Sequence, residues 1–171
     1  MIRTASIALL LALGLSACGF HLREALVLPD HMGEVKVTAR DAYSPLALSL
    51  ERALERAGAR VVDADTKKRV ATLAVRSERW ASTPISLDQF GRAQEYTLRY
   101  AVVFALVDAN GDEIVPQQAV ELSRDYISVP TDATGTDTET ELLGREMQRE
   151  MTAAILRRID AATRELRDAA Q

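Results

Sequence analysis

The chain has 171 residues, with 21 Lys and Arg against 25 Asp and Glu, which gives a formal net charge of -4 at pH 7. An acidic chain without a basic tail is not suited to broad nucleic-acid binding, which needs clustered Lys and Arg. The single cysteine excludes an intramolecular disulfide, so the fold must be held by its core. The length is that of one domain.

The first 17 residues predict a secretory signal peptide. Arg3 precedes the apolar run SIALLLALGLSA, which ends at Cys18. A positive charge, a short apolar core and small residues before a cleavage site are typical of such signals. The run is too short to cross a bilayer, because a span of ~30 Å needs about 20 apolar residues. Removing residues 1–17 takes away Arg3 and changes the net charge from -4 to -5.

The order Leu15-Ser16-Ala17-Cys18 resembles the lipobox of bacterial lipoproteins. The resemblance implies that the mature chain begins at Cys18, with an S-diacylglycerol and an N-acyl group as its covalent lipid. Each buried CH₂ contributes ~0.8 kcal/mol, so several acyl chains make a firm anchor. Gly19, in place of aspartate, implies sorting to the outer membrane. The alternatives are an ordinary signal peptide followed by an incidental cysteine, or a buried structural cysteine.

The first part of the mature chain predicts a tether, a strand and a helix. Residues 18–33 show no clear period and are interpreted as a lipidated tether. Residues 34–40, EVKVTAR, alternate apolar and polar side chains, which predicts a half-buried strand. Ser44 fits the N-cap of a helix over 45–57, and Gly58 fits its C-terminal end. The following ARVVDA adds a short extended piece.

The middle of the chain predicts three strands. Alternation over 70–80 indicates the first, and Pro84 marks a loop after it. The strongest strand is QEYTLRYAVVFALVD, 94–108. The Asn-Gly pair at 110–111 is a strong hairpin signal, and the returning strand spans 114–126.

A long helix is expected at the C-terminal end. Thr138 and Glu141 fit a capping box, which places the start of the helix after a loop rich in Thr, Asp and Gly. Apolar residues then recur every three or four positions, as on the buried face of an amphipathic helix. These residues are Leu143, Met147, Met151, Ile155, Ile159, Ala162 and Leu166.

The order strand, helix, strand, strand, strand, helix predicts an α+β fold. We expect a four-stranded mixed sheet with both helices packed on one face, a two-layer sandwich that occupies 34–168 as one domain.

The sequence does not indicate an enzyme. His21 and His31 have no Cys or carboxylate at ligand spacing, and a metal site would need three or four ligands. No nucleophile or phosphate-loop motif is present. Trp80, at the end of a predicted strand, is interpreted as a packing residue at the rim of the sheet in preference to a ligand platform. We therefore expect no catalysis, no metal and no cofactor beyond the lipid on Cys18.

The residues after the lipidation site narrow the class of lipoprotein. CGFHLR, 18–23, resembles the mature start of the LptE family of LPS-assembly lipoproteins. Glu95-Tyr96 in the long strand and the REMQREM…ILRRI pattern of the last helix agree with this resemblance. It extends from Cys18 to about Leu166, and the hexapeptide is its most specific part.

The resemblance implies a component of the lipopolysaccharide translocon that is not an enzyme. Proteins of this family sit as a plug inside the LptD β-barrel as a heterodimer, assist assembly of that barrel, and bind lipopolysaccharide for delivery to the cell surface. The location that it implies is the periplasm-facing side of the outer membrane, with the domain inside the partner barrel. A plug must present polar and small residues to a polar lumen.

Lipopolysaccharide binding calls for Arg or Lys, which pair well with the phosphates of lipid A. Because the chain is acidic, we expect a local patch, with Arg92 as the first candidate because GRAQEY resembles the position where the family has a basic residue. The further candidates are Arg99, Arg76 and Arg79. Relatives can carry a lysine before the last helix, whereas residues 127–141 contain no Lys or Arg.

Two other functions compete with this one. A stand-alone periplasmic lipid- or peptide-binding lipoprotein would have a closed apolar pocket, whereas a plug has a broad, shallow, polar surface. The polar positions of strand 95–107 and the pair Gln117-Gln118 favour the plug. A lipoprotein hydrolase is disfavoured because no nucleophile constellation is present.

Overall fold

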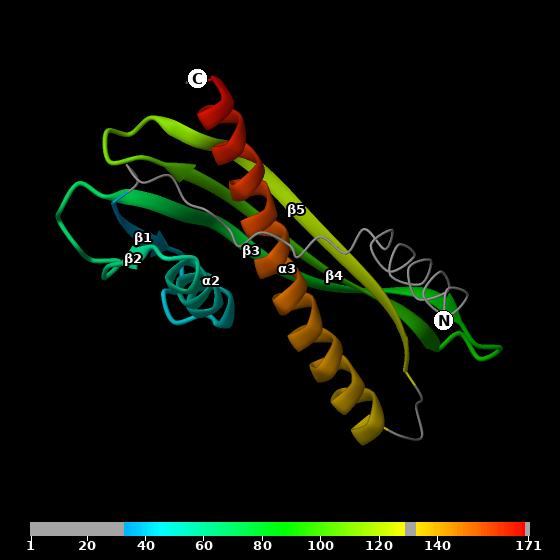
Figure 1. Cartoon of the computed structure of the whole chain (residues 1–171). Coiled ribbons are helices and arrows are strands. Elements are labelled where there is room, and N and C mark those ends of the chain that lie inside the picture. Colours follow the sequence, from blue (N-terminus) through cyan, green and yellow to red (C-terminus); the bar gives the residue numbers. More distant parts are fainter. Residues whose placement is uncertain (1–32, 129–132, 170–171) are drawn as a thin grey trace, which may run out of the picture.

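The computed structural model describes residues 33–128 and 133–169 (Figure 1). The predicted signal peptide, the predicted lipidation site at Cys18 and nearly all of the predicted tether lie outside the described residues. The elements in chain order are β1 (Glu34–Thr38), α2 (Pro45–Arg56), β2 (Arg60–Val61), β3 (Ala71–Leu87), β4 (Ala93–Val107), β5 (Glu113–Ile127) and α3 (Ala133–Ala169).

The predicted α+β sandwich is confirmed, and both helices lie on the same face of one mixed sheet (Figure 1). The sheet has five strands instead of the expected four, in the order β2-β1-β3-β4-β5. β1 runs parallel to β2 and β3, and the remaining neighbours are antiparallel. The added strand is β2, only two residues long, in which Val61 pairs with Val35. It falls within ARVVDA, which was predicted as a short extended piece but not counted as a strand of the sheet.

The ends of α2 follow their predicted signals. The Ser44 hydroxyl accepts a 3.2 Å hydrogen bond from the Ala47 N–H. The helix ends at Arg56, one residue before the predicted end. Gly58 has a φ of 90°, which favours glycine, and its N–H donates to the Glu55 carbonyl at 2.9 Å. The Ala59 N–H donates to the Leu54 carbonyl at 3.0 Å, which completes a Schellman motif. This turn sends the chain back to form β2 beside β1.

β3 is longer than predicted and includes Pro84, which the sequence placed in a loop. β1 pairs with β3 only as far as Thr38 opposite Ala74. Beyond that point β3 pairs only with β4 within the described residues. Proline lacks an N–H and is tolerated in an edge strand, because no neighbour needs the missing donor. The segment Arg76–Leu87 is therefore an edge of the sheet.

α3 begins at Ala133, so the predicted capping box at Thr138 and Glu141 is wrong. Thr138 lies inside the helix. The Thr140 hydroxyl donates to the Thr136 carbonyl at 2.8 Å, so a threonine that could have competed with the helical backbone is satisfied within the helix. The predicted apolar stripe is otherwise correct, except that Leu166 is 47% exposed.

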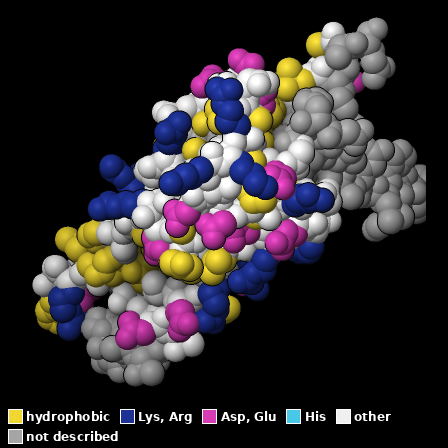
Figure 2. Space-filling view, turned by 90° about the vertical axis from the view of Figure 1, so that its left-hand side faces the viewer, with side chains coloured by type: hydrophobic (Ala, Val, Ile, Leu, Met, Phe, Trp, Pro, Cys, Tyr) yellow, Lys and Arg dark blue, Asp and Glu magenta, His cyan; other side chains and the backbone are white. Residues whose placement is uncertain are grey.

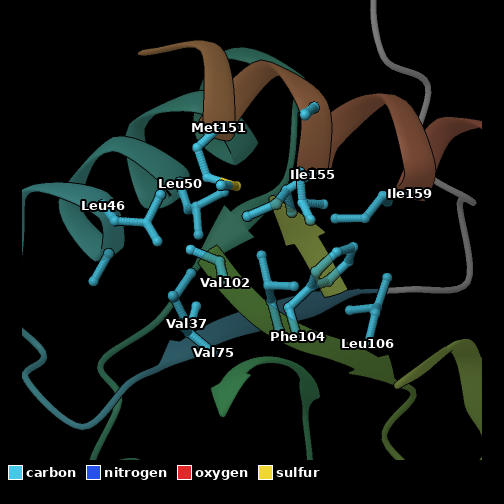
Figure 3. Packing of buried hydrophobic residues seen from close by; sticks show 14 of the residues in the cluster. Val37, Leu46, Leu50, Val75, Val102, Phe104, Leu106, Met151, Ile155 and Ile159 are labelled. Carbon is cyan, nitrogen blue, oxygen red and sulfur yellow. The ribbon is translucent and has the colours of Figure 1, made fainter. Parts of the chain in front are cut away.

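The core lies between the two helices and the sheet (Figure 3). In Figure 3, Leu46 and Leu50 of α2 and three residues of α3 point toward strand residues, among which Phe104 is central. The three α3 residues are Met151, Ile155 and Ile159, and each is fully buried. A hydrogen bond of 3.1 Å from the Thr152 hydroxyl to that of Ser49 joins α3 to α2. The helices are thus held to each other as well as to the sheet.

The opposite face of the sheet has no helix over it within the described residues. Side chains at alternate positions of β3, β4 and β5 point to this outer face, because paired residues of neighbouring strands share a face. Searched over residues 33–128 and 133–169, the helices include none that is long and apolar enough to cross a membrane.

Candidate functional site

The outer face of the sheet is lined by small and polar side chains. They include Ser77, Ala81, Thr83, Thr97, Ala101, Ala119, Ser123 and Asp125. The Thr97 hydroxyl donates to the Asp125 carboxylate at 2.6 Å, which fixes two of the polar groups across β4 and β5. Gln117 is exposed, whereas Gln118 accepts a 2.7 Å hydrogen bond from Arg158 of α3 and belongs to the helix side. The outer face is a broad, mostly polar surface, and its middle carries the charged side chains of Arg79, Arg99 and Glu121.

Arg99 lies on this outer face. Its guanidinium is 3.8 Å from the Glu121 carboxylate of β5, and both side chains are more than half exposed. An exposed pair of this kind contributes little to stability. The negative charge of Glu121 offsets the positive charge of Arg99, which lowers the net positive charge of the surface around Arg99.

Arg92 lies at the tip of the β3–β4 hairpin, at the far end from β2. Asp88 organises this turn, since its Oδ1 accepts hydrogen bonds from the N–H groups of Phe90 at 2.8 Å and Arg92 at 3.0 Å. The Arg92 guanidinium is 2.7 Å from Asp88 Oδ2 and lies over the Phe90 ring, 5.2 Å from its centroid. The hydrogen bond from the Arg92 N–H, followed by that from its side chain, lowers the pKa of Asp88. Arg92 is thus held in place by its own turn.

Arg76 and Arg79 lie together in a cleft of about 710 Å³ on the edge of β3. The register of β3 against β4 shifts between Val75 and Ser77, so Arg76 is the extra residue of a β-bulge. Bulges redirect side chains, and here the bulge stands where β1 has ended. The end of β1 and the start of α2 form the opposite wall, which adds Arg40. Within the described residues, these three arginines make no hydrogen bond or ion pair.

Trp80 forms part of the same cleft, and its ring stacks on Tyr100 of β4 with centroids 3.8 Å apart. Tyr100 is fully buried, and its hydroxyl donates a 2.7 Å hydrogen bond to the Glu78 carboxylate. Trp80 remains 39% exposed. It also lines a second hollow of about 290 Å³ next to Gly144 of α3. Trp80 therefore packs on the sheet, as predicted, and presents its remaining surface to both hollows.

Of the four predicted arginines, Arg76 and Arg79 line one cleft, which Arg79 reaches from the outer face, where it lies diagonally across from Arg99. Arg92 lies apart from them at the hairpin tip. Arg40 was not among the predicted candidates, because its relation to β3 depends on where β1 ends. Basic and acidic side chains are intermixed on the face shown in Figure 2, so the molecule has no continuous basic surface there. Among the described residues, no group of three or more His, Cys, Asp or Glu side chains is placed to hold a metal ion.

The sequence and the fold match one family of proteins. A family model described as LptE, lipopolysaccharide-assembly, matches residues 32–159. The chain is 27% identical over 144 residues to the LPS-assembly lipoprotein LptE of Pectobacterium atrosepticum, covering 84% of this chain and 77% of that protein. It is 28% identical over 144 residues to the protein of the same name from Yersinia pestis, covering 84% and 69%.

Two solved structures resemble this one. The solution structure of lipoprotein B from Nitrosomonas europaea has a TM-score of 0.68 and 29% identity, covering 85% of this chain and 92% of that chain. The crystal structure of rare lipoprotein B from Shewanella oneidensis also has a TM-score of 0.68, at 24% identity, covering 79% and 99%, and shows the shared fold. Because the family model matches well over half of the chain, the protein belongs to the LptE family of lipopolysaccharide-assembly lipoproteins.

Proposed function

We propose that this protein is the lipoprotein component of the lipopolysaccharide translocon, sits inside the LptD β-barrel, assists the assembly of that barrel and binds lipopolysaccharide on its way to the cell surface. The proposal extends the family's role in lipopolysaccharide assembly to a defined partner and ligand. Cys18 would provide the lipid anchor in the outer membrane, with the domain reaching into the barrel from the periplasm.

The outer face of the sheet is the observation that supports the plug most directly. The lumen of an outer-membrane barrel is polar, so a protein that fills it needs a polar surface. Alternate residues of β3, β4 and β5 supply such a surface, with Ala101, Ala119 and Ser123 among its small side chains. The apolar residues of the same strands are turned to the helices, where they are buried. One sheet therefore serves both the core and a polar contact.

The competing hypothesis of a stand-alone binder required a closed apolar pocket. The cleft on the β3 edge contains three arginines and the carboxylates of Asp41 and Glu78, and several of its residues are exposed. Charged groups stand in its walls and it is not enclosed, so it is not the closed apolar pocket that an acyl chain or an apolar peptide would need. This cleft favours the translocon component over the stand-alone binder.

The partner can be tested by purification from outer membranes. The chain is expressed in its own organism with a C-terminal tag, solubilised in mild detergent and washed stringently. We expect a large β-barrel protein in stoichiometric amount. Recovery of the lipoprotein alone, or with soluble periplasmic proteins only, would contradict the plug.

A pair of variants tests which face meets the barrel. Ala119→Trp adds a bulky ring on the exposed outer face of β5, and Ala161→Trp adds the same ring on the exposed side of α3. We expect Ala119→Trp to reduce recovery of the barrel severalfold and Ala161→Trp to have the smaller effect. Circular dichroism checks that both variants fold. The reverse order of effects would show that the helix side is the principal contact.

A further inference from the structure

We propose that the cleft on the β3 edge is a binding site for a phosphorylated sugar, with Arg40, Arg76 and Arg79 holding the phosphate and Trp80 supporting the sugar ring. The inference deepens the proposed function and rests on it for the identity of the natural ligand, since lipopolysaccharide has a phosphorylated saccharide at its base. The chemistry of the site itself is argued from the cleft alone.

The three arginines indicate an anion. A guanidinium group binds phosphate through two parallel hydrogen bonds, whereas an ammonium group acts as a point charge. Arg92 and Arg99 already have a carboxylate partner at 2.7 Å and 3.8 Å. The arginines of the cleft have no such partner within the described residues, although Asp41 and Glu78 stand in the same walls. Their donors are therefore available to a ligand.

The two carboxylates indicate that the ligand is more than a simple anion. Asp41 Oδ1 accepts a 2.9 Å hydrogen bond from the Tyr43 N–H, and Glu78 Oε1 accepts one from the Tyr100 hydroxyl. Each carboxylate has a second oxygen, and carboxylate oxygens are good acceptors for hydroxyl groups. A site for inorganic phosphate would gain nothing from these negative charges. A phosphorylated sugar presents a phosphate to the arginines and hydroxyl groups to the carboxylates.

Trp80 supplies the remaining part of such a site. The C–H face of a sugar ring packs on an aromatic ring, which offers a rigid apolar surface. The stacking of Trp80 on the fully buried Tyr100, and the hydrogen bond from Tyr100 to Glu78, hold the indole in one orientation. The cleft volume of about 710 Å³ lies within the range of about 300–1,000 Å³ found for small-molecule sites. The packing role of Trp80 and a role as a ligand platform are thus compatible.

Trp80 is the one tryptophan in the chain, so selective excitation of tryptophan reports on this cleft and the adjoining hollow beside Gly144, and the arginine variants below assign the signal to the cleft. The full-length lipoprotein in detergent is titrated with lipopolysaccharide, glucosamine phosphate, glucosamine and inorganic phosphate. We expect a saturable change in emission with the first two, and about tenfold weaker binding of glucosamine or phosphate alone. Glucosamine phosphate tests the cleft without acyl chains, and lipopolysaccharide tests the natural source.

Substitutions of the cleft arginines test whether the change in Trp80 emission depends on them. Arg76→Ala and Arg79→Ala should each raise the Kd for glucosamine phosphate about tenfold. Arg157→Ala, which removes an exposed arginine of α3 outside the cleft, should bind as the unaltered protein does. Both cleft arginines are exposed, so these variants should fold, and circular dichroism checks this. Unchanged affinity in both cleft variants would overturn the site.

The outcomes separate this inference from the proposed function. If lipopolysaccharide co-sediments with the protein but leaves the Trp80 emission unchanged, and glucosamine phosphate does the same, the cleft is not the site and lipopolysaccharide binding stands. If glucosamine phosphate binds and lipopolysaccharide does not, the site stands with a soluble sugar phosphate as its ligand, and that part of the proposed function fails. If neither ligand binds in any assay, both fail.

Discussion

The hydroxyl of Tyr100 on β4 donates a 2.7 Å hydrogen bond to the carboxylate of Glu78 on β3. Tyr100 is fully buried and Glu78 is partly buried, so the pair places a charged acceptor at the border of the core. No other hydrogen bond of the Tyr100 hydroxyl is found among the described residues. The two side chains therefore depend on each other.

Tyr100→Phe should destabilise the protein by about 1–2 kcal/mol, because it leaves a partly buried carboxylate without its donor. The free energy of unfolding is measured by urea titration. Tyr43→Phe is the matched control, since Tyr43 is 85% exposed and its loss should change stability by less than about 0.5 kcal/mol. Equal stability of the two variants would show that the hydrogen bond contributes nothing.

Tyr100 also predicts a loss of stability at high pH. Burial, and then the hydrogen bond to Glu78, raise the pKa of Tyr100 far above its ordinary value. A group whose pKa is raised by folding stabilises the protein below its unfolded pKa, about 10 for tyrosine, and that stability declines as the pH rises above this value. Unfolding measured across this range should show the decline in the unaltered protein and a smaller one in Tyr100→Phe. Parallel curves for the two proteins would contradict the raised pKa.

Two glycines should respond in opposite directions to the same substitution. Gly58 has a φ of 90° at the end of α2, so Gly58→Ala is expected to cost about 1 kcal/mol through backbone strain. Gly144 lies within α3, and a Cβ there would meet no atom within 4 Å. Gly144→Ala should therefore stabilise by about 0.5–1 kcal/mol, the difference in helix propensity. Thermal unfolding of both variants distinguishes these effects, and a shift of the same sign in both would contradict them.

Truncating two different residues of the apolar stripe of α3 should change the free energy of unfolding by very different amounts. Ile155 is fully buried against the sheet, and Ile155→Ala should cost about 2–5 kcal/mol, from lost burial and the cavity left behind. Leu166→Ala removes a side chain that is 47% exposed near the end of the helix, and should cost under about 1 kcal/mol. Chemical denaturation compares the two. A large loss in Leu166→Ala would mean that the end of α3 is covered in solution.

The hairpin tip should lose stability in acid. Hydrogen bonds from Arg92, first from its N–H, lower the pKa of Asp88 in the folded protein. A group of this kind stabilises the fold above its unfolded pKa of about 3.9, and the stabilisation is lost as the pH falls through the lowered pKa. Asp88→Asn should therefore differ most from the unaltered protein near neutral pH. The carboxyl titration followed by NMR checks the direction, and an Asp88 pKa above the ordinary value would contradict it.

The sequence predicted the elements whose signals are local. Alternation identified the long strands, and the Ser44 and Gly58 signals placed α2 to within one residue. The pairing of the short extended piece β2 with β1 and the continuation of β3 through Pro84 could not be predicted, because each depends on which strand lies beside it. The start of α3 was missed because its first turns are rich in Thr and Asp, which favour caps in isolated sequence.

The candidate site shows the same division. The arginines were selected one by one, and only the β-bulge after Val75 and the end of β1 bring Arg40 and Arg76 to one cleft. The absence of catalytic motifs in the sequence agrees with the family, whose members are lipopolysaccharide-assembly lipoproteins and not cofactor-dependent enzymes. The composition and motifs of the sequence disfavoured nucleic-acid binding and catalysis. The strand order was needed to show which residues form the cleft on the β3 edge.

The early end of β1 has a mechanical consequence. One half of the molecule is a five-stranded slab braced by α2 and α3, whereas beyond Thr38 only β3, β4 and β5 continue, as a narrower ribbon. Bending resistance falls as strands and packed layers are removed, and regions with fewer buried contacts open at lower free energy. The slab can therefore act as a stiff base, and bending of the domain would be taken up mainly by the ribbon.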